Sequence, residues 1–418
     1  MNQATLNYVH QHADDDVRML ALRGSKDPEV DLAAALQQIQ GRQTARRKLP
    51  SWAAVDAIVY PPHLNMEQCS SEQTARYKAT LCRRLLAVRC DAAVSHLPSP
   101  SHPSTLFDLT GGLGVDFAFM SKAFDEATYV ERNPQLFAIS SENLRLLTPT
   151  ARCLNADGLD VLRQTNHASV IYLDPARRDD HGSRTYGIAD CTPNVLKVKD
   201  ELLEKADFIV LKLSPMLDWR KAVSDLGETF VREVHVVAVG NECKELLLVL
   251  SARGEGLRLF CANDNQLFSP LYPELSASSE QAPHSVSPAH TAHTESLTGA
   301  YLYEPNASIM KAGCFAAVAQ AFGVVQLAPN SHLFVSDSLV NDFPGRRFQI
   351  SAVSSMNKRD IKQQTAELKQ ANITTRNFPL SVAELRKRLK LSDGGDTYIF
   401  ATTLANGDHV LLMAHAPI

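Results

Sequence analysis

The sequence predicts an α/β fold: an open, mostly parallel sheet that follows a helical domain and precedes a small α+β region. The first observation is a short apolar strand that runs into three glycines within 107–116 (FDLTGGLGVD). The second is that the next three apolar stretches are followed by carboxylates, at Glu131, Asp157 and Asp174. Because parallel strands end on one edge of an open sheet, that edge is where a ligand is expected to bind.

Residues 1–98 are expected to form an N-terminal helical domain, because apolar residues recur there at near-helical spacing. The spacing of Ser70-Ser71-Glu72-Gln73 is typical of a capping box and predicts a helix that ends near Val94. Five basic residues of this helix are expected to face solvent rather than a polyanion: Arg76, Lys78, Arg83, Arg84 and Arg89.

The glycine-rich turn can adopt backbone angles closed to other residues and lets the main chain approach a ligand. A dinucleotide site prefers G-x-G-x-x-G, but the third glycine position is Phe117 here, and Asp116 would place negative charge beside a pyrophosphate. S-adenosylmethionine has no phosphate and carries a sulfonium cation, so Asp108 and Asp116 create no conflict with it. The methyl donor is therefore the preferred ligand.

The segment 99–255 is expected to contain this sheet. After the Asp-Pro pair at Asp174, the pattern predicts a helix over 193–205 and a fifth strand over 208–213. The stretches 234–239 and 245–250 flank a Gly-Asn turn and predict a hairpin. A terminal antiparallel hairpin is typical of methyltransferase sheets and not of plain dinucleotide-binding domains.

This segment resembles the class I S-adenosylmethionine-dependent methyltransferases, and the resemblance implies a Rossmann-like sheet. It also implies that the three glycines pass under the methionine and ribose moieties. Asp108 would orient the loop or the amino group, Glu131 would take the ribose diol, and Asp157 would accept from the adenine amino group. The implied cofactor-binding residues are Asp108, Thr110, Gly111, Gly112, Gly114, Asp116, Glu131, Arg132, Asn133 and Asp157.

The predicted catalytic residues are Asp174, Pro175 and Arg177. Asp174 would accept hydrogens of a base amine, the carbonyls around Pro175 could assist, and Arg177 would contact a phosphate or a base edge, or pair with a nearby acid. Asp-Pro-Ala-Arg differs from the Asp/Asn-Pro-Pro-aromatic motif of amino-methylating enzymes, because it lacks the aromatic that stacks on the base. Three residues could supply the stacking: Tyr172, Tyr186 and Trp219.

A second alternative is the Asp-Pro-Pro-Arg motif of enzymes that methylate carbon five of pyrimidines. Those enzymes need a cysteine nucleophile after strand five. Here that position is Ser214, and Cys191 is expected in a loop. The covalent route is therefore disfavoured.

Residues 256–299 are expected to be a partly disordered linker, because the composition of 276–298 turns to Ser, His, Ala, Pro and Thr without periodicity. Beyond it, 300–343 predicts a small unit with one apolar helix to about Phe322 and two short strands. The last unit, 344–418, predicts an extended segment, two helices over 358–370 and 382–389, and a hairpin.

The strings QCSSEQTARYKA, YLYEPNASIMKAG, FPGRRFQI, TTRNFPLSVAELRKRLKL and GGDTYIFATT resemble a bacterial group that joins a methyltransferase domain to a ferredoxin-like unit and a THUMP-like domain. The resemblance covers nearly the whole chain. Because THUMP domains proper accompany tRNA-modifying enzymes, it implies an RNA partner, either tRNA or rRNA.

Charge supports the same partner. Residues 344–390 contain eleven Lys/Arg and three Asp/Glu, a net charge of +8, while the whole chain carries -4. Such asymmetry indicates a surface that faces a polyanion. The expected RNA-binding residues are Arg346, Arg347, Arg376, Arg386, Lys387 and Arg388.

Composition excludes several classes of protein. The eight cysteines contain no C-x-x-C pair, which favours reduced thiols and argues against zinc, and no metal is expected. No apolar run reaches membrane-spanning length, so a cytoplasmic protein is expected.

The sequence therefore predicts an S-adenosylmethionine-dependent methyltransferase that methylates a base nitrogen of RNA directly. The alternatives are a methyltransferase for a small molecule or protein, and a non-catalytic RNA-binding protein with a vestigial cofactor fold.

Overall fold

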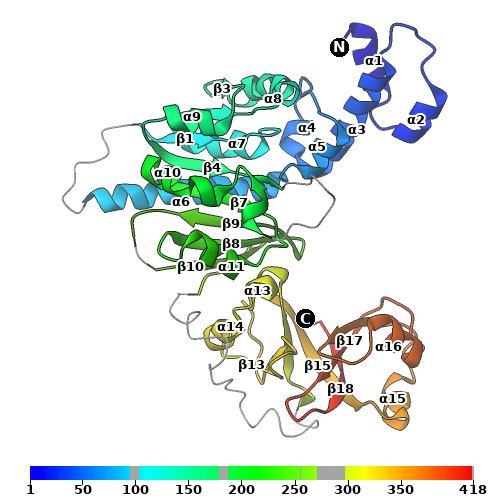
Figure 1. Cartoon of the computed structure of the whole chain (residues 1–418). Helices are drawn as coiled ribbons and strands as arrows, with labels where there is room; N and C mark the ends of the chain where they lie inside the picture. Colours follow the sequence, from blue (N-terminus) through cyan, green and yellow to red (C-terminus); the bar gives the residue numbers. More distant parts are fainter. Residues whose placement is uncertain (95–102, 178–186, 255, 271–296, 417–418) are drawn as a thin grey trace. The chain divides into compact units, whose positions relative to one another are not determined.

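The computed structural model describes residues 1–94, 103–177, 187–254, 256–270 and 297–416 (Figure 1). The chain forms two compact units, each described by itself below. The first consists of Met1–Val234 and Lys244–Leu257, and the second of His235–Cys243 and Arg258–Ile418.

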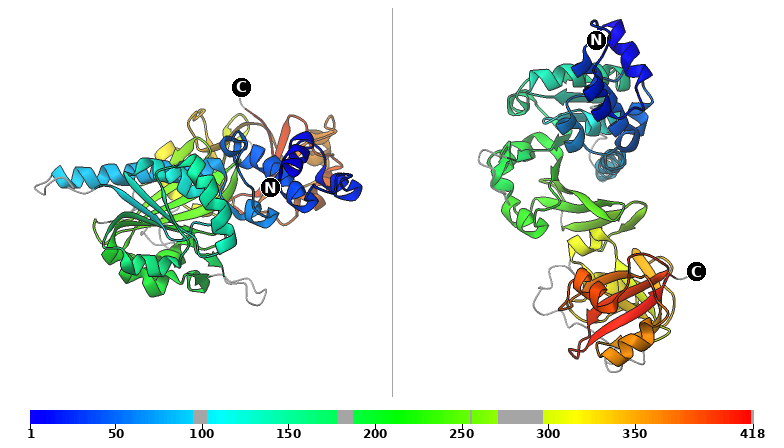
Figure 2. Two further views of the ribbon diagram at one scale, coloured as in Figure 1. Left: turned by 90° about the horizontal axis from the view of Figure 1, so that it is seen from above. Right: turned by 90° about the vertical axis from the view of Figure 1, so that its right-hand side faces the viewer.

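The first unit begins with the predicted helices. Their bounds are α1 Gln3–Gln11, α2 Val17–Arg23, α3 Leu32–Lys48, α4 Pro50–Ala53, α5 His63–Gln68 and α6 Glu72–Val94. The side chains of Asn2, Asp16 and Asp31 accept hydrogen bonds from first-turn N–H groups of α1, α2 and α3, which fixes where these helices start. The long helix α6 is easily followed in Figure 2.

The sheet of the first unit follows α6. Its parallel strands are β1 Thr105–Asp108, β2 Glu126–Val130, β3 Arg152–Leu154, β4 Ala168–Leu173 and β7 Ala206–Leu213. The strand order is β3-β2-β1-β4-β7-β9-β8, where β9 (Glu242–Leu250) runs antiparallel to β7 and β8 spans Val231–Val239. The predicted parallel strands and the hairpin are therefore confirmed, and the order reverses between β1 and β4. A reversal of this kind opens the crevice in which doubly wound sheets bind ligands.

Helices and short elements connect these strands. The helices are α7 Val115–Met120, α8 Pro134–Leu147, α9 Gly158–Gln164, α10 Val195–Lys205 and α11 Trp219–Leu226. Two single 3-10 turns are η1 Ser121–Ala123 and η2 Ile188–Asp190, and a small hairpin is formed by β5 Ala176–Arg177 and β6 Cys191–Thr192. Every residue of β4 is buried, as expected for a strand at the centre of a covered parallel sheet.

The second unit contains a seven-stranded sheet of order β13-β14-β12-β15-β18-β17-β16. The helices and strands of the second unit, of which β10 and β11 lie outside this sheet, are β10 Arg258–Asn263, β11 Gln266–Phe268, β12 Tyr301–Pro305, α13 Ala307–Ala312, α14 Phe315–Phe322, β13 Val325–Gln326, β14 Phe334–Ser336, β15 Gly345–Ser355, α15 Lys358–Thr365, β16 Asn372–Arg376, α16 Val382–Leu389, β17 Thr397–Thr403 and β18 His409–His415.

Two expectations for this unit need correction. Strands β10 and β11 lie inside 256–299, so the linker interpretation is wrong for 258–268, while 271–296 lie outside the described residues. The single apolar helix expected to end near Phe322 is two helices, because Gly313 adopts a left-handed conformation (φ 67°) that caps α13.

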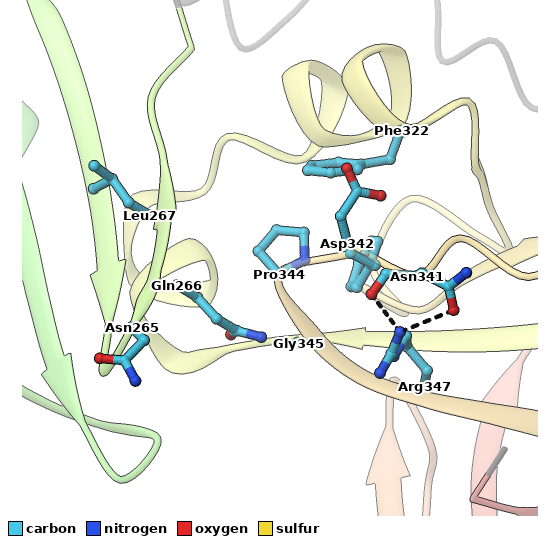
Figure 3. A pocket seen from close by; sticks show the side chains of 10 residues that line it. Asn265, Gln266, Leu267, Phe322, Asn341, Asp342, Pro344, Gly345 and Arg347 are labelled. Carbon is cyan, nitrogen blue, oxygen red and sulfur yellow. Dashed lines mark hydrogen bonds between the residues drawn. The ribbon is translucent and has the colours of Figure 1, made fainter. Parts of the chain in front are cut away.

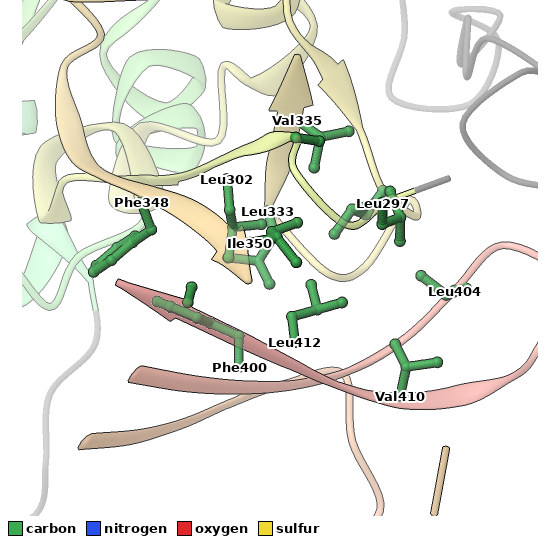
Figure 4. Close-up of a cluster of buried hydrophobic side chains, with 13 residues drawn as sticks. Leu297, Leu302, Leu333, Val335, Phe348, Ile350, Phe400, Leu404, Val410 and Leu412 are labelled. Atoms are coloured by element: carbon green, nitrogen blue, oxygen red, sulfur yellow. The ribbon is translucent and has the colours of Figure 1, made fainter. Parts of the chain in front are cut away.

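Each face of the C-terminal sheet has its own apolar cluster. Figure 4 shows one of them, in which Leu302 of β12, Phe400 of β17 and Leu412 of β18 meet. The other contains Ile361 of α15 and Leu385 of α16, packed against Ile399 and Leu411 of the same two strands. Helices α15 and α16 therefore cover one face of this sheet together.

Candidate active site

The glycine-rich turn joins β1 to α7 and is fixed to its neighbours. A Cβ atom on Gly111 would lie 2.1 Å from the ring of Tyr129, so only glycine fits against that ring. Gly112 and Gly114 have positive φ angles of 55° and 82°. The carbonyl oxygen of Gly112 accepts hydrogen bonds from the hydroxyls of Tyr129 and Ser140. The turn is therefore a partly buried backbone loop anchored to β2 and α8.

Asp108 ends β1 below this turn. Its carboxyl is 1% exposed and accepts a hydrogen bond from the N–H of Thr110 at 3.1 Å. Burial raises the pKa of Asp108 well above its usual range, and the nearby carboxylates of Asp116, Asp174 and Glu131 act in the same direction. A cation placed beside Asp108 would reverse this preference for the neutral form.

Glu131 ends β2 and faces the same turn. Oε2 accepts from the N–H of Gly112 at 2.8 Å, and Oε1 accepts from the N–H of Asn133 at 2.7 Å. A carboxylate has about four acceptor sites, so both oxygens retain capacity for further hydroxyl donors. The side chain of Asn133 caps α8, and a surface depression beside it is lined by Arg132, Asn133, Pro134 and Gln135.

Asp157 follows β3 and is exposed. Its carboxylate accepts from the N–H of Leu159 at 2.8 Å and so caps α9. The neighbouring Asn155 donates to the carbonyl oxygen of Glu131 at 2.7 Å, which ties the ends of β2 and β3 together. The role of Asp157 toward adenine stays a prediction.

Asp174 follows β4 with its side chain 40% exposed. Its N–H donates to the hydroxyl of Thr110 at 2.6 Å, and its Oδ2 lies 2.6 Å from Nζ of Lys212. Pro175 is buried, and Arg177 lies in β5 with its side chain outside the described residues. The carboxylates of Asp108 and Glu131 and the main chain of Asp174 thus all contact the one turn.

Asp116 points away from the surface of the turn. Its Oδ2 accepts from the hydroxyls of Ser70 and Tyr172 at 2.8 and 2.7 Å, and its Oδ1 lies 3.1 Å from Nζ of Lys78. Burial acts to raise the pKa of Asp116, but Lys78 and Lys212 outweigh it and lower that pKa. Both carboxylate oxygens are therefore already engaged within the protein, and a contact of Asp116 with the cofactor stays a prediction.

Lys78 corrects a sequence expectation. Instead of facing solvent, its side chain is 0% exposed, and Nζ contacts both carboxylate oxygens of Glu245 at 2.6 and 2.7 Å. Arg84 of the same helix pairs with Glu233. The reason is that one face of α6 packs against the sheet, and β8 and β9 supply the acids that compensate buried cations. Sequence reasoning also missed Glu245, because no local pattern links it to a residue 167 positions earlier.

Two of the three aromatic side chains considered for base contacts are buried. Tyr172 is buried and donates to Asp116, and Trp219 is buried at the start of α11. Tyr186 lies outside the described residues. Cys191, which pairs with Arg177 in the small hairpin, is buried as well, so its thiol is not presented as a nucleophile.

Several of the predicted RNA-binding residues in the second unit are engaged internally. Arg346 and Arg376 both pair with Glu304, which is 4% exposed. Arg386 pairs with Asp393 at 2.6 Å. Arg388 donates to the carbonyl oxygen of Met356 at 3.1 Å, while Lys387 is exposed. Other exposed cations on α15 and α16 or directly after them are Lys358, Arg359, Lys362 and Lys390.

The remaining predicted cation, Arg347, lines a small cavity of about 290 Å³ in the second unit. Figure 3 shows its guanidinium group bonded to Asn341, and Phe322 and Asp342 line the same cavity. The cavity contains none of the residues predicted for methyl transfer. Within the described ranges, no helix is long and apolar enough to cross a membrane, and no cluster of His, Cys, Asp and Glu is arranged for a metal ion.

Comparisons with known proteins agree with this description. A family model for a ferredoxin-like domain matches 301–344, and one described as THUMP domain-like matches 345–416. A crystal structure of a putative methyltransferase from Porphyromonas gingivalis W83 is similar over 99% of this chain and 98% of its own, with 31% identity and a TM-score of 0.81.

Two further solved structures match at low similarity. A SAM-dependent methyltransferase from Agrobacterium tumefaciens is 16% identical over 41% of this chain and 61% of its own, with a TM-score of 0.28. A putative RNA methyltransferase from Pyrococcus horikoshii is 13% identical over 49% of this chain and 96% of its own, with a TM-score of 0.33. No curated protein matches the sequence.

Proposed function

We propose that this chain, which belongs to the family of class I methyltransferases that end in a ferredoxin-like and a THUMP-like domain, transfers a methyl group from S-adenosylmethionine to a base nitrogen of RNA. The observation that carries the proposal is that Asp108, Glu131 and Asp174 all contact one glycine turn. Three strands of an open sheet end there in carboxylates, which a structural role alone does not require.

The residues present fit this cofactor. The turn offers a backbone cradle at Gly112, and Glu131 retains acceptor capacity for two hydroxyl groups beside the depression at 132–135. Asp108 is an acid whose ionised form needs a neighbouring cation, and an amino group would supply one. When bound, the cofactor supplies an electrophilic methyl group on sulfur.

The chain's own residues would align the substrate rather than activate it covalently, because a displacement at carbon depends chiefly on placement. The bound cofactor would supply the methyl carbon for a new N–C bond and its sulfur would keep the electron pair of the S–C bond. The half-exposed carboxylate of Asp174 would accept the proton that the substrate nitrogen loses. The buried state of Cys191 gives no support to a covalent route.

The basic stretch 344–390 of the second unit supports RNA as the substrate. Because Arg346, Arg376 and Arg386 pair with acids of the same unit, the exposed cations of α15 and α16 are the better candidates for phosphate contacts. Phosphate contacts place RNA without reading its sequence. We therefore assign phosphate binding to the exposed cations of α15 and α16, and methyl transfer to the residues at the strand ends.

The proposal is tested first by calorimetry with S-adenosylmethionine. Wild type should bind in the micromolar range, about -8 kcal/mol, whereas Asp108→Ala and Glu131→Ala should bind at least tenfold more weakly. Asp225→Asn, which alters an exposed acid of α11, is the control and should bind as wild type does. Absence of binding by folded wild type would leave the chain without an enzymatic role.

The substrate is then identified by incubating the enzyme and labelled cofactor with total RNA, protein and small-molecule fractions from a strain that lacks the gene. Label in a nucleoside of tRNA or rRNA supports the proposal, and mass spectrometry of that nucleoside identifies the methylated atom. Label confined to the protein or small-molecule fraction would replace RNA by that substrate class.

A further inference from the structure

Lys212 lies near the end of β7 and joins two carboxylates. Its Nζ is 2.6 Å from Oδ2 of Asp174 and 3.9 Å from Oδ2 of Asp116, and its side chain is 13% exposed. Burial acts to lower the pKa of Lys212, but Asp174, Asp116 and Glu245 outweigh burial and raise that pKa. Lys212 is therefore a firmly charged ammonium group at the predicted catalytic edge.

The contacts of Lys212 belong to a longer series of ion pairs in which acids and lysines alternate. Asp116 is shared with Lys78, and Lys78 is held by Glu245. Buried ions of this kind stabilise a fold weakly at best, because desolvation offsets their attraction. This series of ion pairs is fully buried at Glu245 and half exposed at Asp174, so its exposed end is accessible to a substrate.

Lys212 and Thr110 together fix the direction of Asp174. Lys212 engages Oδ2, and the hydroxyl of Thr110 accepts from the main-chain N–H. Among the side chains that the structure describes, none donates to Oδ1, and the Asp174 side chain is 40% exposed. The carboxylate is thus held on one side and open on the other, which is the geometry required of an acceptor for a substrate proton.

Negative charge around Asp174 is dense. Asp174 acts electrostatically on Asp108 of β1, Tyr172 of β4 and Lys212 of β7. These groups interact in turn with Asp116 of α7, Glu131 after β2 and Glu245 of β9, and Lys78 of α6 acts on Asp116 and Glu245. Lys78 is buried against Glu245, and among the described side chains Lys212 is the cation that directly contacts Asp174.

We propose that Lys212 is a positioning residue for methyl transfer, which holds Oδ2 of Asp174, leaves Oδ1 open to the substrate and compensates the carboxylate charge beside the methyl donor. This inference rests on the proposed function. The positive charge of Lys212 should affect the two ligands differently, because the sulfur of S-adenosylmethionine is positively charged and that of S-adenosylhomocysteine is neutral.

The test compares the affinities of these two ligands, which share the adenosine and amino-acid moieties. Calorimetry is performed on the full chain for wild type, Lys212→Met, Lys212→Arg and the control Lys221→Met, which removes an exposed lysine that pairs with Asp225. Removing the charge of Lys212 should shift the affinity ratio at least threefold toward S-adenosylmethionine. Lys212→Arg and Lys221→Met should keep the wild-type ratio.

Steady-state methylation of total RNA supplies the second readout. Lys212→Met should lower kcat at least tenfold with KM for RNA within twofold, and Lys212→Arg should restore most of the loss. If Lys212→Met does not fold, Lys212→Gln takes its place. An unchanged ligand ratio, or equal kcat in the methionine and arginine variants, overturns the inference while leaving the methyltransferase proposal intact. Absence of binding of either ligand to wild type overturns the proposed function instead.

Discussion

The hydroxyl of Thr110 accepts a hydrogen bond from the main-chain N–H of Asp174 at 2.6 Å. Thr110 follows β1 and Asp174 follows β4, so one side chain aligns the ends of the two strands between which the strand order reverses. The predicted catalytic carboxylate is therefore positioned by its backbone as well as by Lys212.

Thr110→Val should reduce methyl transfer more than it reduces stability. The variant keeps the shape of the side chain but leaves the N–H of Asp174 without its acceptor, at a cost of about 1 kcal/mol in the free energy of unfolding. Thr105→Val is a matched control, because Thr105 accepts from the N–H of Ser169 at 3.0 Å between the same two strands. Urea titrations should show similar losses in both variants, whereas only Thr110→Val should lower kcat. Equal rates in the two variants would contradict the role of Thr110.

Gly111→Ala should destabilise the protein by about 1 to 3 kcal/mol, because the new methyl group would overlap the ring of Tyr129. Its affinity for S-adenosylmethionine should fall as the turn is displaced. Gly240→Ala is the comparison: Gly240 has a positive φ of 57°, but no atom lies within 4 Å of the added Cβ. Denaturant unfolding measures the loss of stability, and calorimetry measures the loss of affinity for S-adenosylmethionine. Normal affinity in Gly111→Ala would contradict the assignment of the turn to cofactor binding.

Asp108→Asn should change the pH dependence of stability. Burial raises the pKa of Asp108 in the folded state above the usual value of 3.8, so the folded state binds this proton more tightly than the unfolded chain does. The stability that this group contributes is present below that value and is lost as pH rises toward the folded pKa. Without ligand, the free energy of unfolding of wild type should therefore fall relative to Asp108→Asn as pH rises above 3.8 toward the folded pKa. A difference independent of pH would show that Asp108 is ionised in the folded protein.

Lys78→Met should be strongly destabilising, because it leaves Glu245 and Asp116 buried without their cation. Breaking a buried pair on one side costs about 3 to 5 kcal/mol. The double variant Lys78→Met/Glu245→Leu should recover part of that loss, since the unpaired Glu245 is removed as well. Thermal and denaturant unfolding measure both. If the double variant loses at least as much free energy of unfolding as the two single variants together, the pair does not interact as described.

Sequence reasoning succeeded where the signal is local. Apolar strands that end in carboxylates, the glycine turn and the Gly-Asn hairpin each depend on a few neighbouring residues, and all appear in the structure. Strand β16 escaped notice because Asn372–Arg376 is polar and lies at the edge of its sheet, where burial imposes little alternation.

The charge network could not be found in this way. Lys78 lies on a helix among arginines, and the same residue types there fit either a solvated face or a buried pair. Its partner is 167 residues away on β9, and the pairing depends on how α6 packs against the sheet. Likewise, Arg346 and Arg376 contribute to a +8 segment in the sequence, but the fold places both beside Glu304. Net charge indicates a partner without identifying the side chains that meet it.

RNA binding should depend on the exposed lysines of α15 and α16 rather than on the paired arginines. Lys358→Ala/Lys362→Ala/Lys387→Ala removes three such cations, and the slope of log affinity against log salt should fall by about 0.7 to 0.9 for each phosphate that is no longer neutralised. A fall in slope of about 2 is expected in filter binding with total tRNA, since three cations are removed. The control Lys26→Ala/Lys197→Ala/Lys221→Ala removes three lysines of the first unit and should keep the wild-type slope. If the control loses as much affinity as the test variant, RNA binds through general charge, and the helical face has no special role.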